Sequence, residues 1–207
     1  MNANDESGAG FWDALYASRE PDPSRDPNPQ LAAEAGDLAP GFALDVGCAD
    51  GCDAGWLAER GWRVTAVDVS NVALDRARAA TPNLAERIEW LQADLREWTP
   101  AASRYDLVSA HFVHFLPDER AVVFRRLAAA VRPHGTLLIV GHHPSDLQTT
   151  VKRWPVPDAY ATAEAVAELL TPDEWDVLVT EARPRNVNDP QGNPVTVHDA
   201  IMKARRR

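Results

Sequence analysis

The stretch from Phe42 to Ser70 constrains the fold more than any other part of the chain. It begins with an apolar run, Phe42 to Val46, which is typical of a strand buried on both faces, and a glycine-rich turn follows it directly. A helical pattern comes next, with Asp53 as an acceptable N-cap and Gly61 as a suitable left-handed residue at its end. The chain then returns to a strand that ends at Asp68. This order predicts a βαβ unit of the kind that binds nucleotides.

The turn and the acidic residue indicate which ligands suit this unit. Glycine lets a ligand approach the backbone closely, and a carboxylate at the end of the second strand can accept hydrogen bonds from two ribose hydroxyls. A dinucleotide fingerprint requires G-x-G-x-x-G, but when its first glycine is aligned on Gly47 the other two positions hold Ala49 and Cys52. The spacing therefore disfavours a nicotinamide-dependent oxidoreductase.

The segment 45–51, DVGCADG, resembles the acidic-x-Gly-x-Gly-x-Gly turn of class I S-adenosylmethionine-dependent methyltransferases, with Ala49 at the middle glycine. Asp68 falls where that family places its ribose-binding acid. The resemblance runs from about Asn28 to about Lys203 and is to the small, single-domain bacterial type. It implies S-adenosylmethionine as cofactor and S-adenosylhomocysteine as product. It also implies an α/β fold: a Rossmann-like, doubly wound, mostly parallel seven-stranded sheet with a C-terminal antiparallel hairpin and helices on both faces.

The same resemblance assigns cofactor contacts to the glycine-rich turn and to the ends of three later strands. Asp94 corresponds to the position that receives the adenine amino group, although an aspartate there is also common as a turn or cap residue. Ligands bind outside the carboxyl ends of parallel strands, so these residues are expected at one edge of the sheet. The predicted cofactor-binding residues are Asp45, Gly47, Cys48, Ala49, Gly51, Asp68, Val69, Asp94, Leu95 and Ala110.

The rest of the chain is predicted to alternate between helices and strands. Ser70 is a good N-cap for a helix that ends near Ala80, and the helix over 117–131 is expected to turn Val122, Val123, Leu127 and Val131 inward. Residues 132–135, RPHG, are predicted to form a turn. The other expected helices cover 11–19, 31–38 and 162–170, and the other expected strands cover 87–93, 105–110, 136–140, 174–182 and 195–202.

The N-terminal part is predicted to differ from the domain that follows it. Residues 1–10 are polar and are expected to be disordered, whereas 11–19 reads as an amphipathic helix. The proline-rich segment 21–29 is expected to be a loop. We divide the chain into this tail, helix and loop, 1–30, and a single methyltransferase domain, 31–207. In the resembling family such a segment folds over the cofactor as a lid; the alternative is a tether that only covers the sheet edge.

Four histidines are predicted to converge where the strands end. Methyl transfer depends mainly on positioning, which supplies roughly 7 to 11 kcal/mol, and a general base adds about 10²- to 10⁴-fold. His111, after the fourth strand, is the predicted catalytic base, and the predicted substrate contacts are His114, His142, His143, Trp12 and Tyr16. Phe112, Phe115 and Trp154 are candidate apolar walls, each of which is alternatively a core residue. A structural hydrogen-bonding role for each histidine stays open. A bound metal is the least favoured alternative: His111 and His114 could share a helix face, but no acidic partner with ligand spacing accompanies them.

Composition limits the partners. The net charge of −10 argues against a nucleic-acid substrate, since the only basic run is Lys203 to Arg207, where solvated arginines are expected. The two cysteines, Cys48 and Cys52, match neither a zinc nor a redox spacing. No apolar run approaches the roughly 20 residues that a membrane span needs, and the N-terminus lacks the apolar core of a signal peptide. We therefore expect no membrane contact and a cytoplasmic location.

We predict methyl transfer to the oxygen, nitrogen, sulfur or chalcogen of a small molecule. The alternative is a cofactor-binding protein without turnover, motivated by Ala49 and by the lack of a recognised catalytic signature.

Overall fold

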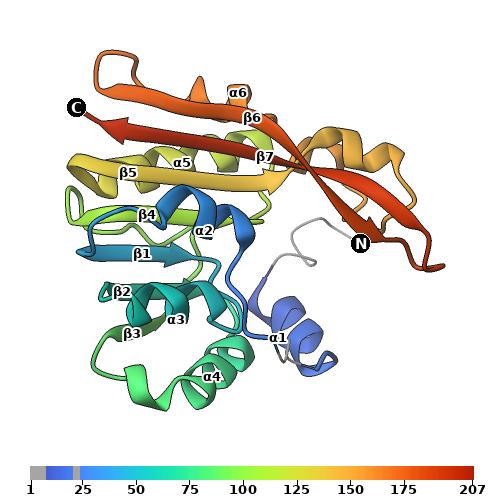
Figure 1. Cartoon of the computed structure of the whole chain (residues 1–207), viewed down its shortest axis with the longest axis horizontal. Helices are drawn as coiled ribbons and strands as arrows, with labels where there is room; N and C mark the ends of the chain where they lie inside the picture. The colour runs from blue at the N-terminus through green and yellow to red at the C-terminus, as the bar shows by residue number, and fades with distance from the viewer. Residues whose placement is uncertain (1–7, 21–23) are drawn as a thin grey trace.

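The computed structural model describes residues 8–20 and 24–207, and its centre is one seven-stranded sheet (Figure 1). The strand order is β3-β2-β1-β4-β5-β7-β6. Strands β1 to β5 pair in parallel, and β7 runs antiparallel to both β5 and β6. This topology confirms the predicted fold class with its C-terminal hairpin. The strands are β1 Phe42–Val46, β2 Arg63–Asp68, β3 Ile88–Gln92, β4 Tyr105–His111, β5 Val131–His142, β6 Trp175–Asn188 and β7 Pro194–Arg206.

Helices cover both faces of the sheet. Apolar residues of α2, α3 and α4 pack on one face, and those of α5 and α6 pack on the other (Figure 1). Helix α1 lies beside α4, near the ends of the central strands (Figure 1). The bounds are α1 Ala9–Ala17, α2 Pro29–Ala35, α3 Cys52–Glu59, α4 Asn71–Ala80, α5 Pro117–Ala130 and α6 Ala163–Ala167, with 3₁₀ turns at Pro82–Leu84, Pro144–Gln148 and Pro157–Ala159.

Helix α4 begins as its sequence predicts. The Ser70 hydroxyl accepts a hydrogen bond from the Ala73 N–H at 3.2 Å, which satisfies a backbone donor that the first turn leaves free. The structure adds a second partner, because Asp13 of α1 accepts hydrogen bonds from the Ser70 hydroxyl at 2.6 Å and from the Val72 N–H at 3.2 Å. The bond from Ser70 is the main reason that the pKa of Asp13 is lowered. Helix α1 is therefore fastened to the start of α4.

The start of α3 corrects a prediction. Gly51, with φ of 76°, is its N-cap, and Asp53 lies inside the first turn. Glycine adopts this left-handed conformation without strain, and a Cβ here would lie 2.4 Å from the Trp90 ring. Gly61 follows the helix with φ of 96°, as predicted. Since Gly51 provides the cap, the Asp53 carboxylate is left to contact other parts of the molecule.

Helix α5 and strand β5 also correct predictions. Val123 and Leu127 are buried, but Val122 is 46% exposed, because successive helical residues are about 100° apart and Val122 falls outside the inward arc. The predicted turn at 132–135 is part of β5, as an irregularity in its pairing with β4. His134, with φ of 66°, lies in this bulge.

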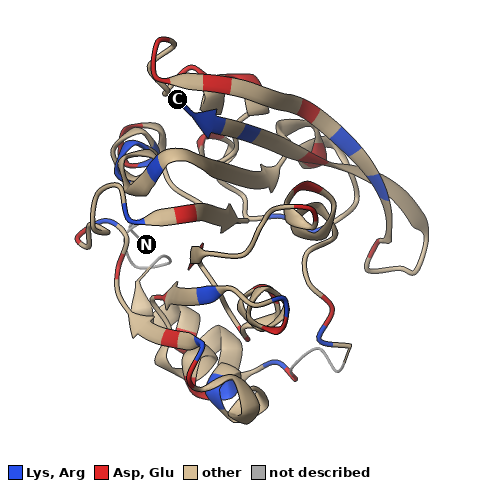
Figure 2. Cartoon of the chain, turned by 60° about the vertical axis from the view of Figure 1, so that its left-hand side comes forward, with Lys and Arg blue, Asp and Glu red and all other residues tan. Residues whose placement is uncertain are grey.

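The predicted ends of several elements were wrong. Helix α6 is shorter than 162–170, while β6 and β7 extend well beyond the predicted strands. The basic run at the C-terminus, up to Arg206, is part of β7 and is visible as the blue end of that strand (Figure 2). There Arg206 donates a hydrogen bond to the Val131 carbonyl, and Arg207 pairs with Asp176 at 2.8 Å. The long hairpin thus orders this tail, while Arg205 and Arg207 are exposed to solvent, as predicted.

Two predictions concern the N-terminal part. Residues 1–7 and 21–23, which fall in the predicted tail and loop, lie outside the described residues. Ala9 and Gly10 belong to α1, so the predicted disorder is wrong for them. Within residues 8–20 and 24–207, no helix has the length and apolar character that crossing a membrane requires.

Candidate active site

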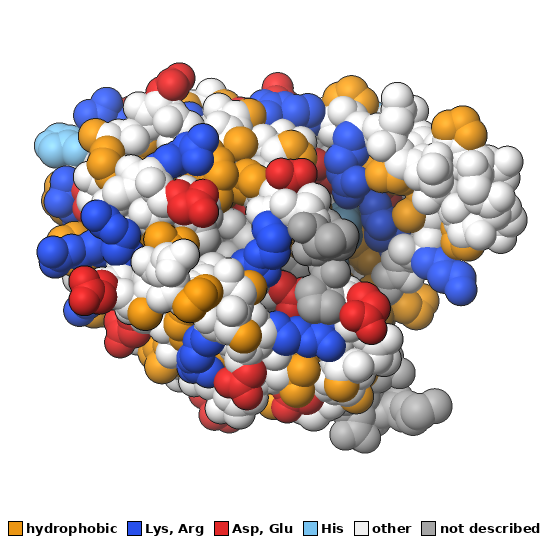
Figure 3. All heavy atoms as spheres, turned by 60° about the horizontal axis from the view of Figure 1, so that its bottom comes forward, with side chains coloured by type: hydrophobic (Ala, Val, Ile, Leu, Met, Phe, Trp, Pro, Cys, Tyr) orange, Lys and Arg blue, Asp and Glu red, His pale blue; other side chains and the backbone are white. Residues whose placement is uncertain are grey.

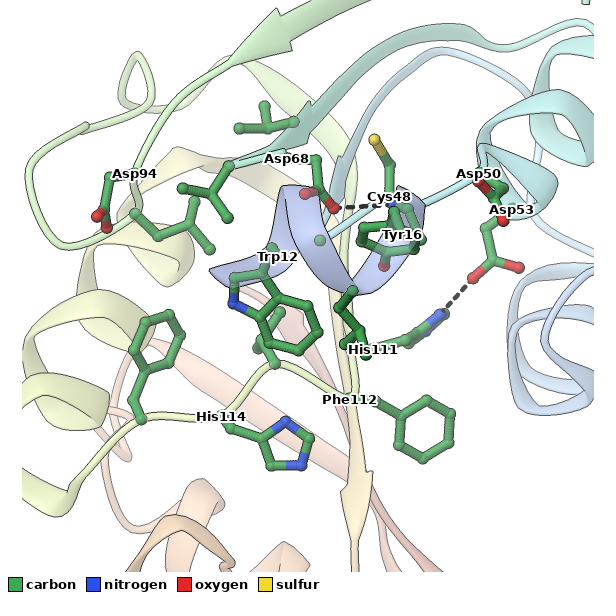
Figure 4. Close-up of a pocket in the computed structure, with 18 of the residues that line it drawn as sticks. Trp12, Tyr16, Cys48, Asp50, Asp53, Asp68, Asp94, His111, Phe112 and His114 are labelled. Carbon is green, nitrogen blue, oxygen red and sulfur yellow. Dashed lines mark hydrogen bonds and ion pairs between the residues drawn. The ribbon is translucent and has the colours of Figure 1, made fainter. Parts of the chain in front are cut away.

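A cavity of about 700 Å³ lies at the carboxyl ends of the central strands (Figure 4). Its walls come from α1, from the turn after β1, from the ends of β2 and β4, and from the segments that follow β3 and β4. A volume of this size is within the usual range for small-molecule sites. The parallel strands therefore bring together residues that are far apart in the sequence, at the edge where ligands of open α/β sheets bind.

The turn after β1 is left-handed at three positions. Gly47, Ala49 and Gly51 have φ values of 71°, 49° and 76°. The N–H groups of Gly47 and Cys48 donate to the Val67 carbonyl at 2.8 and 3.1 Å, which fixes the turn to the end of β2. Glycine accepts these angles readily, but Ala49 does so under strain of roughly 1 to 3 kcal/mol. The residue that departs from the methyltransferase pattern is therefore held in a glycine conformation.

Replacing Ala49 by glycine is expected to raise the free energy of unfolding by about 1 kcal/mol. The strain at φ of 49° disappears, and the greater freedom of glycine in the unfolded chain offsets roughly 0.4 to 1 kcal/mol of that gain. Urea denaturation measures the change. Ala79→Gly on the exposed side of α4 is the matched control, and it should lose roughly 0.5 to 1 kcal/mol. Equal destabilisation by both substitutions would contradict the strain at Ala49.

Asp68 supports this turn from the end of β2. One carboxylate oxygen accepts the Ala49 N–H at 2.9 Å (Figure 4), and the other accepts the Ser70 N–H at 2.9 Å. Burial is the main cause that raises the pKa of this carboxyl. The sequence predicted a ligand contact for Asp68, and the structure adds a role in shaping the backbone around the cavity.

Seven of the ten predicted cofactor residues line the cavity. Asp45 and Ala110 are buried within β1 and β4 instead, and Gly51 packs against Trp90. Burial and the nearby Asp53 raise the pKa of Asp45, whose Oδ2 has no hydrogen-bond partner within the described part of the chain. A cationic ligand would relieve this accumulation of carboxyl groups. The seven are Gly47, Cys48, Ala49, Asp68, Val69, Asp94 and Leu95.

For Asp94 the sequence left two roles open, a cofactor contact and a turn or cap residue. It lines the cavity and also pairs with Arg96, whose Nη2 lies 2.6 Å from Asp94 Oδ2, and it accepts the Arg96 N–H at 2.9 Å. The hydrogen bonds from Arg96 lower the pKa of Asp94. The structure thus contains the turn aspartate that was the alternative, and the adenine contact stays a prediction.

His111 is the last residue of β4, whereas the sequence placed it just after the strand. Its Nδ1 lies 2.7 Å from Asp53 Oδ2 (Figure 4). The side chain is only 6% exposed, and Nε2 has no hydrogen-bond partner among the described residues. The imidazole therefore forms part of the cavity wall with one nitrogen bound to a carboxylate and the other unpaired.

Two further histidines form an aromatic cluster on the same side. The His142 ring stacks on Phe112 with centroids 4.4 Å apart, and His114 makes edge contacts with Trp154 and Tyr160. Burial is the main cause that lowers the pKa of both histidines, that of His142 to about 3. These rings are therefore uncharged near neutral pH.

His143 does not join this cluster. It is outside the cavity lining, and its Nδ1 lies 2.9 Å from the Ser145 hydroxyl at the start of the 3₁₀ turn Pro144–Gln148. Successive residues of an extended strand point to opposite sides, so His142 and His143 separate. Three of the four histidines converge as predicted, and the fourth has the structural role that was left open.

Helix α1 closes the cavity on another side. Trp12 and Tyr16 project from it toward the ends of the strands (Figure 4) and line the cavity, as do the predicted apolar walls Phe112, Phe115 and Trp154. Burial and the charge of Asp68 raise the pKa of Tyr16. The predicted substrate contacts from this helix are therefore placed within reach of a ligand.

Sequence reasoning missed the polar contacts that hold these parts together. Asp53 accepts the Asn28 N–H at 2.6 Å, and Arg25 donates to the Asp50 carbonyl at 2.7 Å. Asp13 was missed as a partner of Ser70. None of these residues carries a local signal for its role, because each partner lies 25 or more positions away in the sequence.

Comparisons with known proteins agree with this geometry. A methyltransferase-domain family profile matches residues 43–135. Trans-aconitate 2-methyltransferase of Azoarcus sp. (strain BH72) is 43% identical over 149 residues, which are 68% of this chain and 56% of that protein. The chain thus spans little more than half the length of this curated relative.

Solved structures show the same fold. One, from work on the conversion of a disulfide bond into a thioacetal group during echinomycin biosynthesis, has a TM-score of 0.76 at 23% identity and covers 96% of this chain and 92% of its own. Another is Burkholderia thailandensis 1,6-didemethyltoxoflavin-N1-methyltransferase with bound 1,6-didemethyltoxoflavin and S-adenosylhomocysteine, which has a TM-score of 0.61 at 23% identity and covers 86% and 75%.

The turn, the acid at the end of β2 and the matched profile account for one cofactor, S-adenosylmethionine, and they do not favour the nicotinamide alternative. With the strand order and the cavity at the strand ends, they establish that the chain belongs to the class I S-adenosylmethionine-dependent methyltransferases.

Proposed function

We propose that this chain is an enzyme that transfers the methyl group of S-adenosylmethionine to a small-molecule nucleophile, with His111 as general base. The observation that carries the proposal is the continuity of one cavity, whose lining includes both the turn at Gly47 to Ala49 with Asp68 and the imidazole of His111, a ring whose buried Nε2 has no hydrogen-bond partner among the described residues. A protein that only bound the cofactor would not require an acceptor space next to a buried imidazole.

The lining suits a cationic cofactor. Six lining residues are acidic and two, Arg19 and Arg96, are basic, and Arg96 is paired with Asp94. When bound, S-adenosylmethionine supplies a methyl group on a positively charged sulfur, which a nucleophile displaces in line. In our proposal the turn, Val69, Asp94 and Leu95 hold the nucleoside part, and Asp68 binds its ribose. The acidic lining residues are Asp26, Asp50, Asp53, Asp68, Asp94 and Glu119.

The acceptor side indicates the substrate class. Beyond the pair of His111 and Asp53, the lining that follows β4 and β5 includes aromatic rings and uncharged imidazoles, those of Phe112, His114, His142 and Trp154. One relative is named for methylation of trans-aconitate. A tricarboxylate of this kind would bring negative charge into a cavity that is already lined by carboxylates. We therefore propose an acceptor with an aromatic or apolar body and a protic group, such as a phenol, thiol or amine.

Titration calorimetry with S-adenosylmethionine and with S-adenosylhomocysteine tests the cofactor site, and we expect both to bind with micromolar affinity. A panel of phenols, thiols, amines and trans-aconitate, with release of S-adenosylhomocysteine as the readout, then tests turnover. Failure to bind either cofactor form would refute the proposal. Tight cofactor binding without turnover on any acceptor would favour the non-enzymatic alternative, and turnover on trans-aconitate would refute the substrate class.

Other predictions remain proposals. We propose residues 1–30 as the lid of a domain over 31–207, supported by Trp12 and Tyr16 in the cavity wall. The boundary between these two parts falls inside α2, where Gln30 is buried and its side-chain amide donates to Asp199 at 3.1 Å.

On the face in Figure 3, basic and acidic side chains of the described residues are interspersed, which supports a small-molecule acceptor over a nucleic acid. The cytoplasmic location stays a prediction.

A further inference from the structure

We infer that Asp53 is a positioning residue that fixes His111 in the one neutral form able to accept a proton, so that this site serves acceptors that must lose a proton. The inference rests on the proposed function, which assigns the base role to His111. Asp53 comes from the first turn of α3 and His111 from the end of β4, 58 positions later. Only the packing of α3 beside the central strands brings them together.

Both oxygens of the Asp53 carboxylate are engaged, each by a different partner. Oδ1 accepts the Asn28 N–H at 2.6 Å, and Oδ2 lies 2.7 Å from His111 Nδ1. The backbone amide has only a proton to offer, so it fixes the orientation of the carboxylate. Asn28 is in turn the N-cap of α2, where its side chain accepts the Gln30 N–H at 2.8 Å. The carboxylate is therefore held rigidly against the imidazole.

This contact selects the tautomer of His111. A neutral imidazole carries one proton, and a carboxylate can only accept a hydrogen bond, so the proton is on Nδ1. Nε2 is left with a lone pair; it is buried in the cavity wall and has no hydrogen-bond partner among the described residues, so an acceptor that reaches it supplies the partner it lacks. The arrangement is the one in which a buried carboxylate orients a histidine and stabilises its protonated form.

The reaction step balances with these groups alone. The proton of the acceptor moves to His111 Nε2, and the electron pair it leaves on the oxygen, sulfur or nitrogen forms the new bond to the methyl carbon. The pair of the breaking carbon–sulfur bond stays on sulfur, which becomes neutral. The imidazolium is held by Asp53 and returns its proton to water after product release.

The decisive experiment reads the tautomer in the cofactor-free protein. Long-range ¹⁵N–¹H correlation spectra of histidine-labelled protein should show a protonated Nδ1 and a bare Nε2 for the neutral His111 ring. In Asp53→Asn, the Asn28 N–H keeps the amide oxygen on its side, so the amide NH₂ faces Nδ1. The ring should then switch to the form with the proton on Nε2, which cannot act as a base.

Asp50→Asn is the matched control, because Asp50 lines the same cavity three positions earlier, in the turn, and its substitution removes the same charge without touching the bond to His111. It should leave the tautomer unchanged. With an acceptor from the panel, Asp53→Asn should also lower turnover by about 10²-fold or more at unchanged cofactor affinity. A proton on Nε2 of the wild-type ring, or the same tautomer in Asp53→Asn, would overturn the inference. The tautomer is read without cofactor in both the wild-type protein and Asp53→Asn. A failure of the proposed function therefore shows in the calorimetry, whereas a failure of this inference shows in the spectra.

Discussion

Replacing Asp68 by alanine is expected to weaken S-adenosylmethionine binding by about 10- to 150-fold for each ribose hydrogen bond lost. Hydrogen bonds to a charged group contribute roughly 1.5 to 3 kcal/mol, and the proposed contact involves one or two of them. Titration calorimetry measures the change directly. Unchanged affinity would remove Asp68 from the site.

The structure shows that this substitution also affects the turn. Asp68 accepts the N–H groups of Ala49 and Ser70, so its loss leaves two backbone donors without their partner. Urea denaturation without cofactor measures this cost, roughly 1 to 3 kcal/mol for each unsatisfied buried group. Asp68→Asn is the control, because it keeps the shape and one acceptor oxygen but removes the charge.

The pKa of Asp68 also gives this prediction a pH dependence. Burial raises its pKa, so as the pH falls this carboxyl takes up a proton before an exposed aspartate does. A protonated carboxyl is a weaker acceptor for ribose hydroxyls, and cofactor affinity should therefore fall on acidification. Asp68→Asn should lack this part of the pH dependence.

Replacing His111 by alanine is expected to lower turnover by about 10²-fold or more, with little change in cofactor affinity. The loss of a general base has this magnitude, and the ring lies on the acceptor side of the cavity. Single-turnover kinetics with saturating cofactor separates the chemical step from binding. The effect should appear in kcat rather than in KM, because the base acts only as the acceptor loses its proton.

Two other histidines make this test specific. His143→Ala should leave turnover nearly unchanged, because His143 is outside the cavity and bonded to Ser145. His142→Ala removes a ring that stacks on Phe112, so we expect a higher KM for the acceptor with a smaller effect on kcat. A large loss of kcat in His142→Ala with little loss in His111→Ala would move the base to β5.

The sequence by itself determined the fold class and the cofactor end of the site. Strands that are buried on both faces appear in the sequence as continuous apolar runs, which is how the parallel strands were predicted. The glycine-rich turn and the acid at the end of the next strand form a local pattern that can be read without knowing any distant partner. Ser70 was found as a cap for the same reason, since a cap involves only residues within one helical turn. Even Ala49 was recognised as the departing position, although its left-handed angle was visible only in the structure.

The tertiary structure alone decided how the acceptor end is built. Asp53 reads locally as a helix cap, yet Gly51 takes that position and Asp53 pairs with His111 from a strand 58 residues away. The uncharged state of His114 and His142 depends on burial, which neighbouring residues do not specify. The fastening of α1 through Asp13 and the separation of His143 from the cavity likewise depend on where whole elements pack. Periodicity and capping are properties of adjacent residues, whereas the partner and charge of a buried side chain are set by segments that only folding brings together.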